Sequence, residues 1–208
     1  MSLFYRSISE LMLTSRKRIF WDQLQTVRLY YQKPKFALID LTFFFIGLFI
    51  NPYRTCRKFL QKKGAANIYA YGETPFTTYQ KMVDECGIGP DDVWVEMGSG
   101  RGKGCFWLSQ FIKCKVVGIE WIPQFVFFSN MLRKIFRVKN LSFQRVDMQK
   151  ADIAKATVIY LYGNFPQVDI PLTAKVISIS APLEGFTVLK TFWVRYPWGR
   201  TAAFLQKR

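Results

Sequence analysis

The chain has 208 residues, half of them hydrophobic and 17% aromatic, so it can bury a substantial core and is neither disordered nor fibrous. Its 30 basic and 14 acidic residues give a formal net charge of +16, which favours contact with nucleic acid, an acidic protein or an anionic membrane surface. The sequence has no histidine, which excludes Ser-His-Asp and Cys-His catalysis and every metal site that needs a histidine ligand.

Residues 1–63 are expected to form a basic, helical extension. They hold 12 basic and three acidic residues, a net charge of +9 and more than half of the excess of the chain. Apolar residues recur at helical spacing over 7–31, and Lys33-Pro34 then interrupts the pattern. The composition changes after this region, and residues 64–208 are predicted to form the main domain.

The most apolar segment, 36–50, is bordered by basic residues on both sides. Its 15 residues would span about 22 Å as a helix, less than the roughly 30 Å hydrocarbon core of a bilayer. Asp40, near its start, would be costly in lipid. The segment is predicted to be a helix with three open placements: docked on the main domain, lying in the interface of an anionic membrane, or spanning the membrane.

From about residue 69 onward, short apolar runs alternate with segments of helical spacing. Helices are predicted at 76–86, 105–112 and 123–138, and strands at 93–97, 115–120, 141–146, 157–162 and 175–180. The runs 186–196 and 201–206 are predicted to form an antiparallel hairpin at the sheet edge. The alternation predicts an α/β fold with a seven-stranded, mostly parallel sheet and right-handed crossovers.

A glycine-rich turn follows the first of these strands and precedes a helix. It reads Glu96-Met97-Gly98-Ser99-Gly100-Arg101-Gly102. The glycines let a ligand approach the backbone, and the helix adds oriented N–H groups, so Gly98, Ser99, Gly100 and Gly102 are expected to bind a cofactor. A dinucleotide loop would have glycine at position 103, where this chain has lysine. Glu96 at the strand end suits a cationic ligand such as a sulfonium and would repel a pyrophosphate.

Two further acids stand at the ends of the next predicted strands. Glu120 lies 24 residues after Glu96, where an acid of nucleotide-binding α/β folds accepts the two ribose hydroxyls. Asp147 ends the third strand, where adenine's exocyclic amine would need an acceptor, with Met148 beside the ring. Trp121, the residue after Glu120, is also expected to bind the cofactor. Because the carboxyl ends of parallel strands meet at one edge, these residues predict a ligand crevice there.

The pattern of Glu96-x-Gly-x-Gly-x-Gly, Glu120 and Asp147 resembles the class I S-adenosylmethionine-dependent methyltransferases, over about residues 68–208. The resemblance implies a Rossmann-like methyltransferase fold and S-adenosyl-L-methionine as the cofactor. Upstream, Tyr71-Gly72-Glu73-Thr74, followed by the segment 92–100, is similar to the non-SET histone lysine methyltransferases of the disruptor-of-telomeric-silencing type. It also resembles the small protein-lysine methyltransferases of bacteria and mitochondria.

The resemblance implies roles for individual residues. In those families the Tyr-Gly-Glu segment folds over the cofactor, which implies cofactor binding by Tyr71, Glu73 and Thr74. An asparagine-phenylalanine stretch after the fourth strand lines their methyl-transfer channel, a role implied for Asn164 and Phe165. Lys103 stands where the histone enzymes have a polar amide, and their long substrate loops have no room here, so both departures argue against a nucleosome substrate.

A lysine nucleophile would need groups that position and deprotonate its amine. We expect Tyr162 and Asn164 to orient the amine by hydrogen bonds, and Glu73 is the nearest candidate for a general base. Tyr160 and Tyr162 share one strand face, so both are expected to line the channel or both to be buried in the core.

The sequence therefore predicts an S-adenosylmethionine-dependent methyltransferase that acts on a protein lysine. The alternatives are a class I methyltransferase acting on RNA or a small molecule, and a non-catalytic cofactor-binding protein of the same fold. No Asn/Asp-Pro-Pro-Tyr motif follows the fourth strand, which argues against amino methylation of adenine or cytosine. No metal site is expected, because Cys56, Cys86, Cys105 and Cys114 form no CxxC pair. We expect reduced thiols and a cytoplasmic protein, either free or attached to a membrane surface through residues 1–63.

Overall fold

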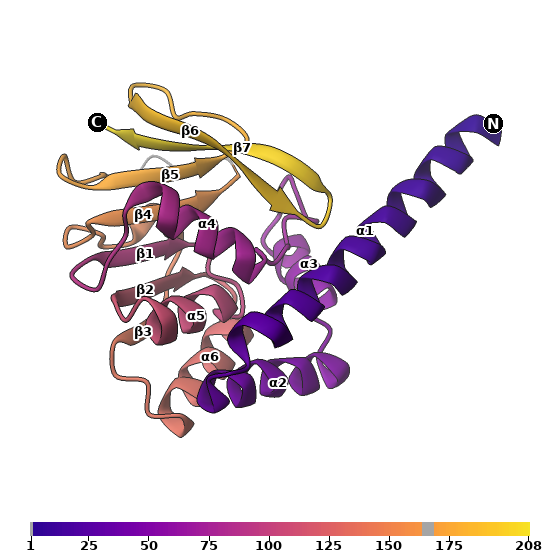
Figure 1. Cartoon of the computed structure of the whole chain (residues 1–208), viewed down its shortest axis with the longest axis horizontal. Coiled ribbons are helices and arrows are strands. Elements are labelled where there is room, and N and C mark those ends of the chain that lie inside the picture. The colour runs from indigo at the N-terminus through magenta and orange to yellow at the C-terminus, as the bar shows by residue number, and fades with distance from the viewer. Residues whose placement is uncertain (1, 164–168) are drawn as a thin grey trace.

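The computed structural model of the chain describes residues 2–163 and 169–208, and it has an α/β architecture (Figure 1). The helices are α1 (Ser2–Tyr30), α2 (Pro34–Phe49), α3 (Pro52–Lys62), α4 (Phe76–Cys86), α5 (Lys103–Phe111) and α6 (Pro123–Ile135), with a 3-10 turn η1 at Met148–Lys150. The strands are β1 (Val93–Met97), β2 (Lys115–Glu120), β3 (Leu141–Arg145), β4 (Val158–Tyr162), β5 (Lys175–Ile179), β6 (Thr187–Tyr196) and β7 (Gly199–Lys207).

The seven strands form one sheet in the order β3-β2-β1-β4-β5-β7-β6. The first five strands are parallel, and the hairpin of β6 and β7 joins β5 in antiparallel register. The predicted parallel sheet and edge hairpin are therefore confirmed, with β7 between β5 and β6. The strand order runs from β1 to β2 and β3 on one side and from β1 to β4 and β5 on the other, so the order reverses between β1 and β4. In such sheets the ligand crevice lies at the carboxyl ends of the strands at this point.

The two faces of the sheet are covered differently. Trp94 and Phe143 lie in the larger core with residues from α4, α5 and α6, whereas Val95 and Ile159 pack in a second core on the opposite face. In the described residues that second face is covered by loop side chains such as Ile153 rather than by helices. Strands buried on both faces need apolar residues at successive positions, which explains the short unbroken apolar runs in the sequence.

Proline and glycine set the helix boundaries. Pro34, Pro52 and Pro123 stand in the first turns of α2, α3 and α6, where the missing N–H group would have no partner in the helix. Helix α4 ends at Gly87, whose φ of 61° lies in the left-handed region. The boundaries predicted for α4, β1 and β2 agree with the structure. Helix α3 was not among the predicted elements.

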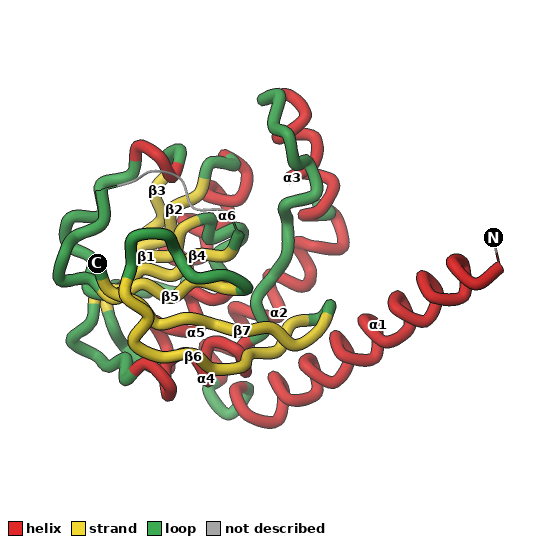
Figure 2. Tube along the Cα trace, turned by 90° about the horizontal axis from the view of Figure 1, so that it is seen from above, coloured by secondary structure: helices red, strands yellow, loops and turns green. Residues whose placement is uncertain are grey.

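The N-terminal helices join the main core. Helix α1 projects away from the sheet with its N-terminal end farthest out (Figure 1 and Figure 2). Its last residue, Tyr30, and Phe36, Ile39 and Phe43 of α2 are buried in the same core as the sheet. One of the three placements of segment 36–50, docking on the main domain, is thus confirmed for one face of α2. The division of the chain at residues 63 and 64 stays a prediction.

Membrane crossing was the third placement. Within the described ranges, no individual helix combines the length and the apolar composition that a membrane span needs. Helices α2 and α3 meet the criterion only when taken together, and the break between them bends the pair by 63°.

Candidate functional site

The glycine loop joins β1 to α5 with left-handed backbone at three positions. Gly98, Gly100 and Gly102 have φ values of 77°, 54° and 77°. A Cβ atom on Gly102 would lie 2.4 Å from the Phe143 ring, and one on Gly100 would lie 3.4 Å from the Tyr71 ring. The left-handed backbone favours glycine at all three positions, and at Gly102 there is also no space for a side chain. The loop backbone can therefore be approached closely by a ligand.

Ser99 does not turn its side chain toward the crevice. Its hydroxyl lies 2.7 Å from where a Cβ atom of Gly118 would stand, and its N–H donates to the carbonyl of Ile119 at 2.9 Å. The side chain is buried. The prediction that Ser99 contacts the cofactor is therefore wrong for its side chain, which packs against β2 and away from the crevice.

Glu120 organises the loop from the end of β2. One carboxylate oxygen accepts from the N–H of Gly100 at 2.8 Å, and the other accepts from the N–H groups of Trp121 and Ile122 at 2.7 and 2.8 Å. Burial raises the pKa of Glu120 to about 7, against the lowering effect of these hydrogen bonds. A carboxylate offers about four acceptor positions, so about one remains for a ribose hydroxyl unless a backbone bond yields.

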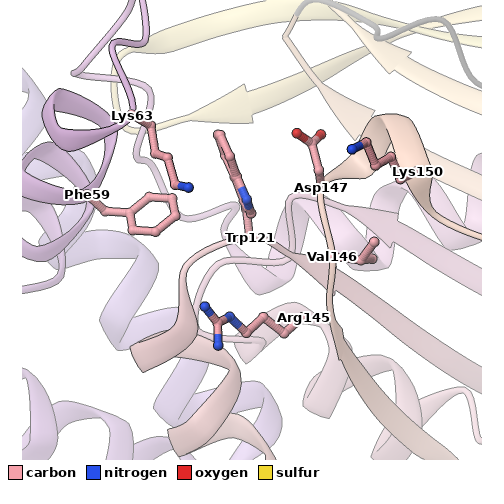
Figure 3. A pocket seen from close by; sticks show the side chains of 7 residues that line it. All are labelled: Phe59, Lys63, Trp121, Arg145, Val146, Asp147 and Lys150. Carbon is pink, nitrogen blue, oxygen red and sulfur yellow. The ribbon is translucent and has the colours of Figure 1, made fainter.

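A cavity of about 520 Å³ opens beside these residues (Figure 3). It is lined by Phe59, Lys63, Trp121, Arg145, Val146, Asp147 and Lys150. The Phe59 and Trp121 rings meet edge to face with centroids 5.2 Å apart, and the Nζ of Lys63 lies 5.2 Å from the Trp121 ring. The structure thus brings Trp121 and Asp147 to one cavity, as predicted.

Asp147 lines the cavity, whereas Met148 contacts the glycine loop. Asp147 accepts from the N–H of Gln149 at 3.1 Å and so caps η1. Met148 does not line the cavity, but its Cε atom lies 3.9 Å from where a Cβ atom of Gly98 would stand. Met148 therefore connects the third strand end to the glycine loop.

Glu96 lies on the buried side of the loop. Its carboxylate accepts from the hydroxyl of Tyr79 at 2.6 Å and from the thiol of Cys105 at 3.3 Å. Burial raises its pKa to about 7, although these hydrogen bonds act in the opposite direction. The expectation that Glu96 offers its carboxylate to a cationic ligand is corrected: both oxygens are engaged by α4 and α5, and Glu96 supports the loop from within.

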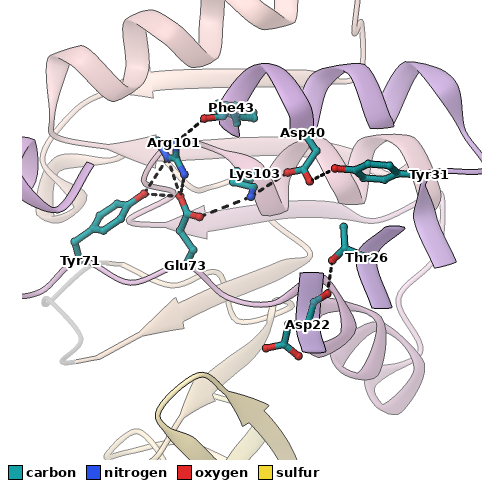
Figure 4. Close-up of polar contacts among 9 residues, drawn as sticks. All are labelled: Asp22, Thr26, Tyr31, Asp40, Phe43, Tyr71, Glu73, Arg101 and Lys103. Carbon is teal, nitrogen blue, oxygen red and sulfur yellow. Dashed lines mark hydrogen bonds and ion pairs between the residues drawn. The ribbon is translucent and has the colours of Figure 1, made fainter. Parts of the chain in front are cut away.

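Glu73 belongs to a charged cluster above the glycine loop (Figure 4). Its carboxylate lies 2.6 Å from the Nη2 of Arg101 and 3.8 Å from the Nζ of Lys103, and it accepts from the hydroxyl of Tyr71 at 2.6 Å. Burial raises its pKa, but Lys103, Arg101 and the hydrogen bonds together outweigh burial and lower it. The interpretation of Glu73 as a general base is therefore wrong, because a carboxylate paired with two cations is a poor proton acceptor.

The predicted Tyr71–Thr74 segment does lie over the loop. The Tyr71 ring covers Gly100, and the hydroxyl of Thr74 lies 2.8 Å from that of Tyr160. Tyr160 is buried and also bonds the hydroxyl of Tyr196 at 3.0 Å, whereas Tyr162 is 47% exposed. The expectation that both tyrosines line the channel or both are buried is wrong. Tyr162 is the last residue of β4, and it is exposed where the four preceding residues of the strand are buried. Asn164 and Phe165 lie outside the described residues.

Sequence reasoning missed Phe59, Lys63 and Arg101. Phe59 lies in the last turns of α3, and Lys63, four residues later, is its C-cap residue, so both face the same side. The predicted apolar segment ends at residue 50, and the next residue, Asn51, caps α3 by accepting from the N–H of Arg54 at 3.1 Å. An asparagine followed by proline at the first helical position was the signal that could have revealed this helix.

The arrangement can hold a nucleoside cofactor with a cationic tail. Left-handed glycines expose the loop backbone, Glu120 retains acceptor capacity, and the cavity beside Trp121 offers aromatic walls to a purine. The acids buried next to the loop, Glu96 and Glu120, disfavour a phosphate there. These features fit S-adenosyl-L-methionine. The described residues contain no cluster of metal-ligating side chains, and all four cysteines are free and buried.

Similar solved structures share this fold. An RNA methyltransferase from Salinibacter ruber in complex with S-adenosyl-L-homocysteine is 24% identical, with 65% of this chain and 94% of that chain covered and a TM-score of 0.55. TrmN from Thermus thermophilus is 10% identical, with 66% and 50% covered and a TM-score of 0.55. Precorrin-6y C5,15-methyltransferase from Geobacter metallireducens GS-15 is 10% identical, with 67% and 91% covered and a TM-score of 0.50. At these identities the likeness shows the fold alone.

The family comparison is more specific. No sequence among the curated proteins matches the chain. The sequence profile described as "Histone methylation protein DOT1" matches residues 54–158, half of the chain. The match runs from α3 through the glycine loop, Glu120 and Asp147 to the start of β4. The chain therefore belongs to the DOT1 family, and it is an S-adenosyl-L-methionine-dependent methyltransferase.

Proposed function

We propose that this enzyme transfers the methyl group to the side-chain amine of a lysine in a protein. The family profile, whose description names histone methylation, supports a protein substrate. The observation that carries the proposal is an aromatic cluster at the carboxyl end of β4, next to the Tyr71–Thr74 segment.

The cluster consists of Tyr160, Tyr162, Tyr196 and Trp198. The Tyr162 and Tyr196 ring centroids lie 5.2 Å apart, and Tyr196 stacks on Trp198 at 5.5 Å with an interplanar angle of 11°. Tyr160 closes the buried end through its hydrogen bonds to Thr74 and Tyr196. Aromatic faces attract an alkylammonium group, and burial among them favours the neutral amine that can act as a nucleophile.

When bound, S-adenosyl-L-methionine supplies a methyl group on a sulfonium, which a nucleophile must approach from the side opposite the sulfur. The contribution of the chain is then positioning rather than base catalysis. Glu73 is held as a carboxylate by Arg101, and both oxygens of Glu96 are engaged in the core. We propose that the lysine amine loses its proton to water as it enters the aromatic cluster, whose outer residue, Tyr162, remains partly exposed.

The test is methylation of a cell lysate with radioactive cofactor and the purified enzyme. Protein-lysine methylation predicts label that survives nuclease, is released by protease, and is recovered as N-methyllysine after acid hydrolysis. Tyr162→Ala should reduce the rate of labelling about tenfold or more, while Phe127→Ala, an exposed aromatic on α6, should leave it unchanged. Label that survives protease but not nuclease would instead support RNA, the substrate that the charge of +16 also accommodates.

A further inference from the structure

Helix α2 has two apolar faces, and only one is used by the fold. Its inner face packs on the domain through Phe36, Ile39, Asp40 and Phe43, which are all buried. Its outer face consists of Leu38, Leu41, Phe44, Phe45, Leu48 and Phe49, which are all exposed. At about 100° per residue, the outer face covers an arc of about 140° and lies nearly opposite the inner one.

The outer face is too apolar for contact with water alone. Phe49 is 87% exposed and Leu48 is 64% exposed. A surface helix usually turns charged and polar side chains outward, and a contiguous exposed apolar patch marks a contact site. The acid of this helix, Asp40, is on the inner face, where its Oδ1 lies 2.9 Å from the Nζ of Lys103. The outer face therefore carries no charge.

Basic residues flank the outer face in the sequence. Lys35 is exposed at the start of α2, and Arg54, Arg57 and Lys58 are exposed on the first two turns of α3, which follows directly. Apolar side chains flanked by cations match the interface of an anionic bilayer, which offers both acyl chains and negatively charged headgroups. Nucleic acid offers the negative charge without an apolar surface for six leucine and phenylalanine side chains.

The length of α2 sets how it would meet a bilayer. Its 16 residues extend about 24 Å, and the inner face is held on the domain, so the helix would lie along the surface. We propose that the outer face of α2 docks on the surface of an anionic lipid bilayer, with Arg54, Arg57 and Lys58 meeting the headgroups.

This docking would place the cofactor loop near the bilayer. The Nη1 of Arg101, a loop residue, donates to the carbonyl of Phe43 at 3.0 Å. One helix, with a diameter of about 10 Å, therefore separates the docking surface from the glycine loop. The methyltransferase would act at the membrane surface, on substrates that are themselves there.

The experiment is flotation of the full-length protein with lipid vesicles. One set contains phosphatidylcholine with about a third phosphatidylglycerol, and the other contains phosphatidylcholine alone. The wild-type protein should float with the anionic vesicles and much less with the neutral ones. Leu38→Ser/Leu48→Ser should lower the bound-to-free ratio about tenfold or more. The matched control Leu172→Ser/Leu189→Ser, which changes leucines of comparable exposure far from α2 in the sequence, should not.

A second pair of variants tests the charges. Arg54→Glu/Arg57→Glu should reduce binding to anionic vesicles and its dependence on salt, whereas Lys139→Glu/Lys155→Glu, also exposed, should leave both unchanged. Circular dichroism checks that each variant is folded.

Four results would overturn the proposal. The first is a wild-type protein that does not float with anionic vesicles, and the second is an equal loss of binding in Leu38→Ser/Leu48→Ser and in Leu172→Ser/Leu189→Ser. The third is vesicle-bound protein that resists alkaline extraction, as expected if α2 and α3 were inserted in the bilayer. The fourth is a dimer, detected by light scattering, that Leu38→Ser/Leu48→Ser abolishes and Leu172→Ser/Leu189→Ser does not. The last result would identify the outer face as an interface between two copies of the chain. None of these readouts depends on which substrate is methylated.

Discussion

The Nζ of Lys103 lies 2.9 Å from the Oδ1 of Asp40, and this ion pair joins the first residue of α5 to the inner face of α2. The Asp40 side chain is 5% exposed and that of Lys103 is 16% exposed. Asp40 also accepts from the hydroxyl of Tyr31 at 3.0 Å. An acid in an apolar helix is thus explained by a cation that stands directly after the glycine loop, and the N-terminal helices are tied to the cofactor site.

Replacing Lys103 should destabilise the fold. Lys103→Met leaves the Asp40 carboxylate buried without its cation, which should lower the free energy of unfolding by about 3 kcal/mol. Urea denaturation measures the change. Lys81→Met, at an exposed pair with Glu85 at 3.7 Å, should cost less than about 1 kcal/mol. Adding Asp40→Asn to Lys103→Met should recover part of the loss. Equal effects of the two lysine variants would contradict the role given to this pair.

Phe59 should contribute to cofactor affinity, although it lies on α3, outside the strand ends and the glycine loop from which the cofactor site was predicted. It forms one wall of the cavity with Trp121. Phe59→Ala should weaken S-adenosyl-L-methionine binding about fivefold or more, since base stacking on an aromatic ring is worth about 1–3 kcal/mol. Calorimetric titration measures this, with Phe127→Ala as the control. An unchanged dissociation constant would exclude Phe59 from the cofactor site.

The stability of the ligand-free protein should fall as pH rises from 5.5 to 8. Burial raises the pKa of Glu96 and of Glu120 to about 7, above the ordinary 4.5. Between those values the folded state binds more protons than the unfolded state, so stability is present at low pH and lost as pH rises through 7. Each group should contribute a loss of about 2 kcal/mol over this range.

The absence of histidine keeps this pH range nearly free of other titrations. Urea unfolding at several pH values measures the slope. Glu96→Gln should flatten it by about half, and Glu184→Gln, at an exposed position, should leave it unchanged. A stability that stays constant or increases between pH 5.5 and 8 would show that the two acids are not buried as described.

The local sequence pattern was sufficient to predict the strands, the glycine loop and α4. Their signals are short-range: apolar runs such as Val93–Met97, closed by glycine or proline, have few alternative structures. The common edge of Glu120, Trp121 and Asp147 also follows from the sequence, because parallel strands end together.

The direction of individual side chains did not follow from the pattern. Glu96 turns inward because Tyr79, 17 residues upstream, supplies a buried hydroxyl. Glu73 is an ion-pair partner because Arg101 reaches it across the loop. Tyr160 is buried, and its hydroxyl is hydrogen-bonded to that of Tyr196 in the edge hairpin. Each of these partners is distant in sequence, and a single sequence does not reveal tertiary pairing.

Glu120 and the glycine loop should form the S-adenosyl-L-methionine site, and calorimetric titration of the cofactor into the full-length protein measures this. We expect micromolar binding by the wild type and a loss of about tenfold or more, equivalent to 1.4 kcal/mol, in Glu120→Ala. Glu184→Ala should bind as the wild type does. No heat of binding with the wild type, or equal affinity of wild type and Glu120→Ala, would contradict this assignment.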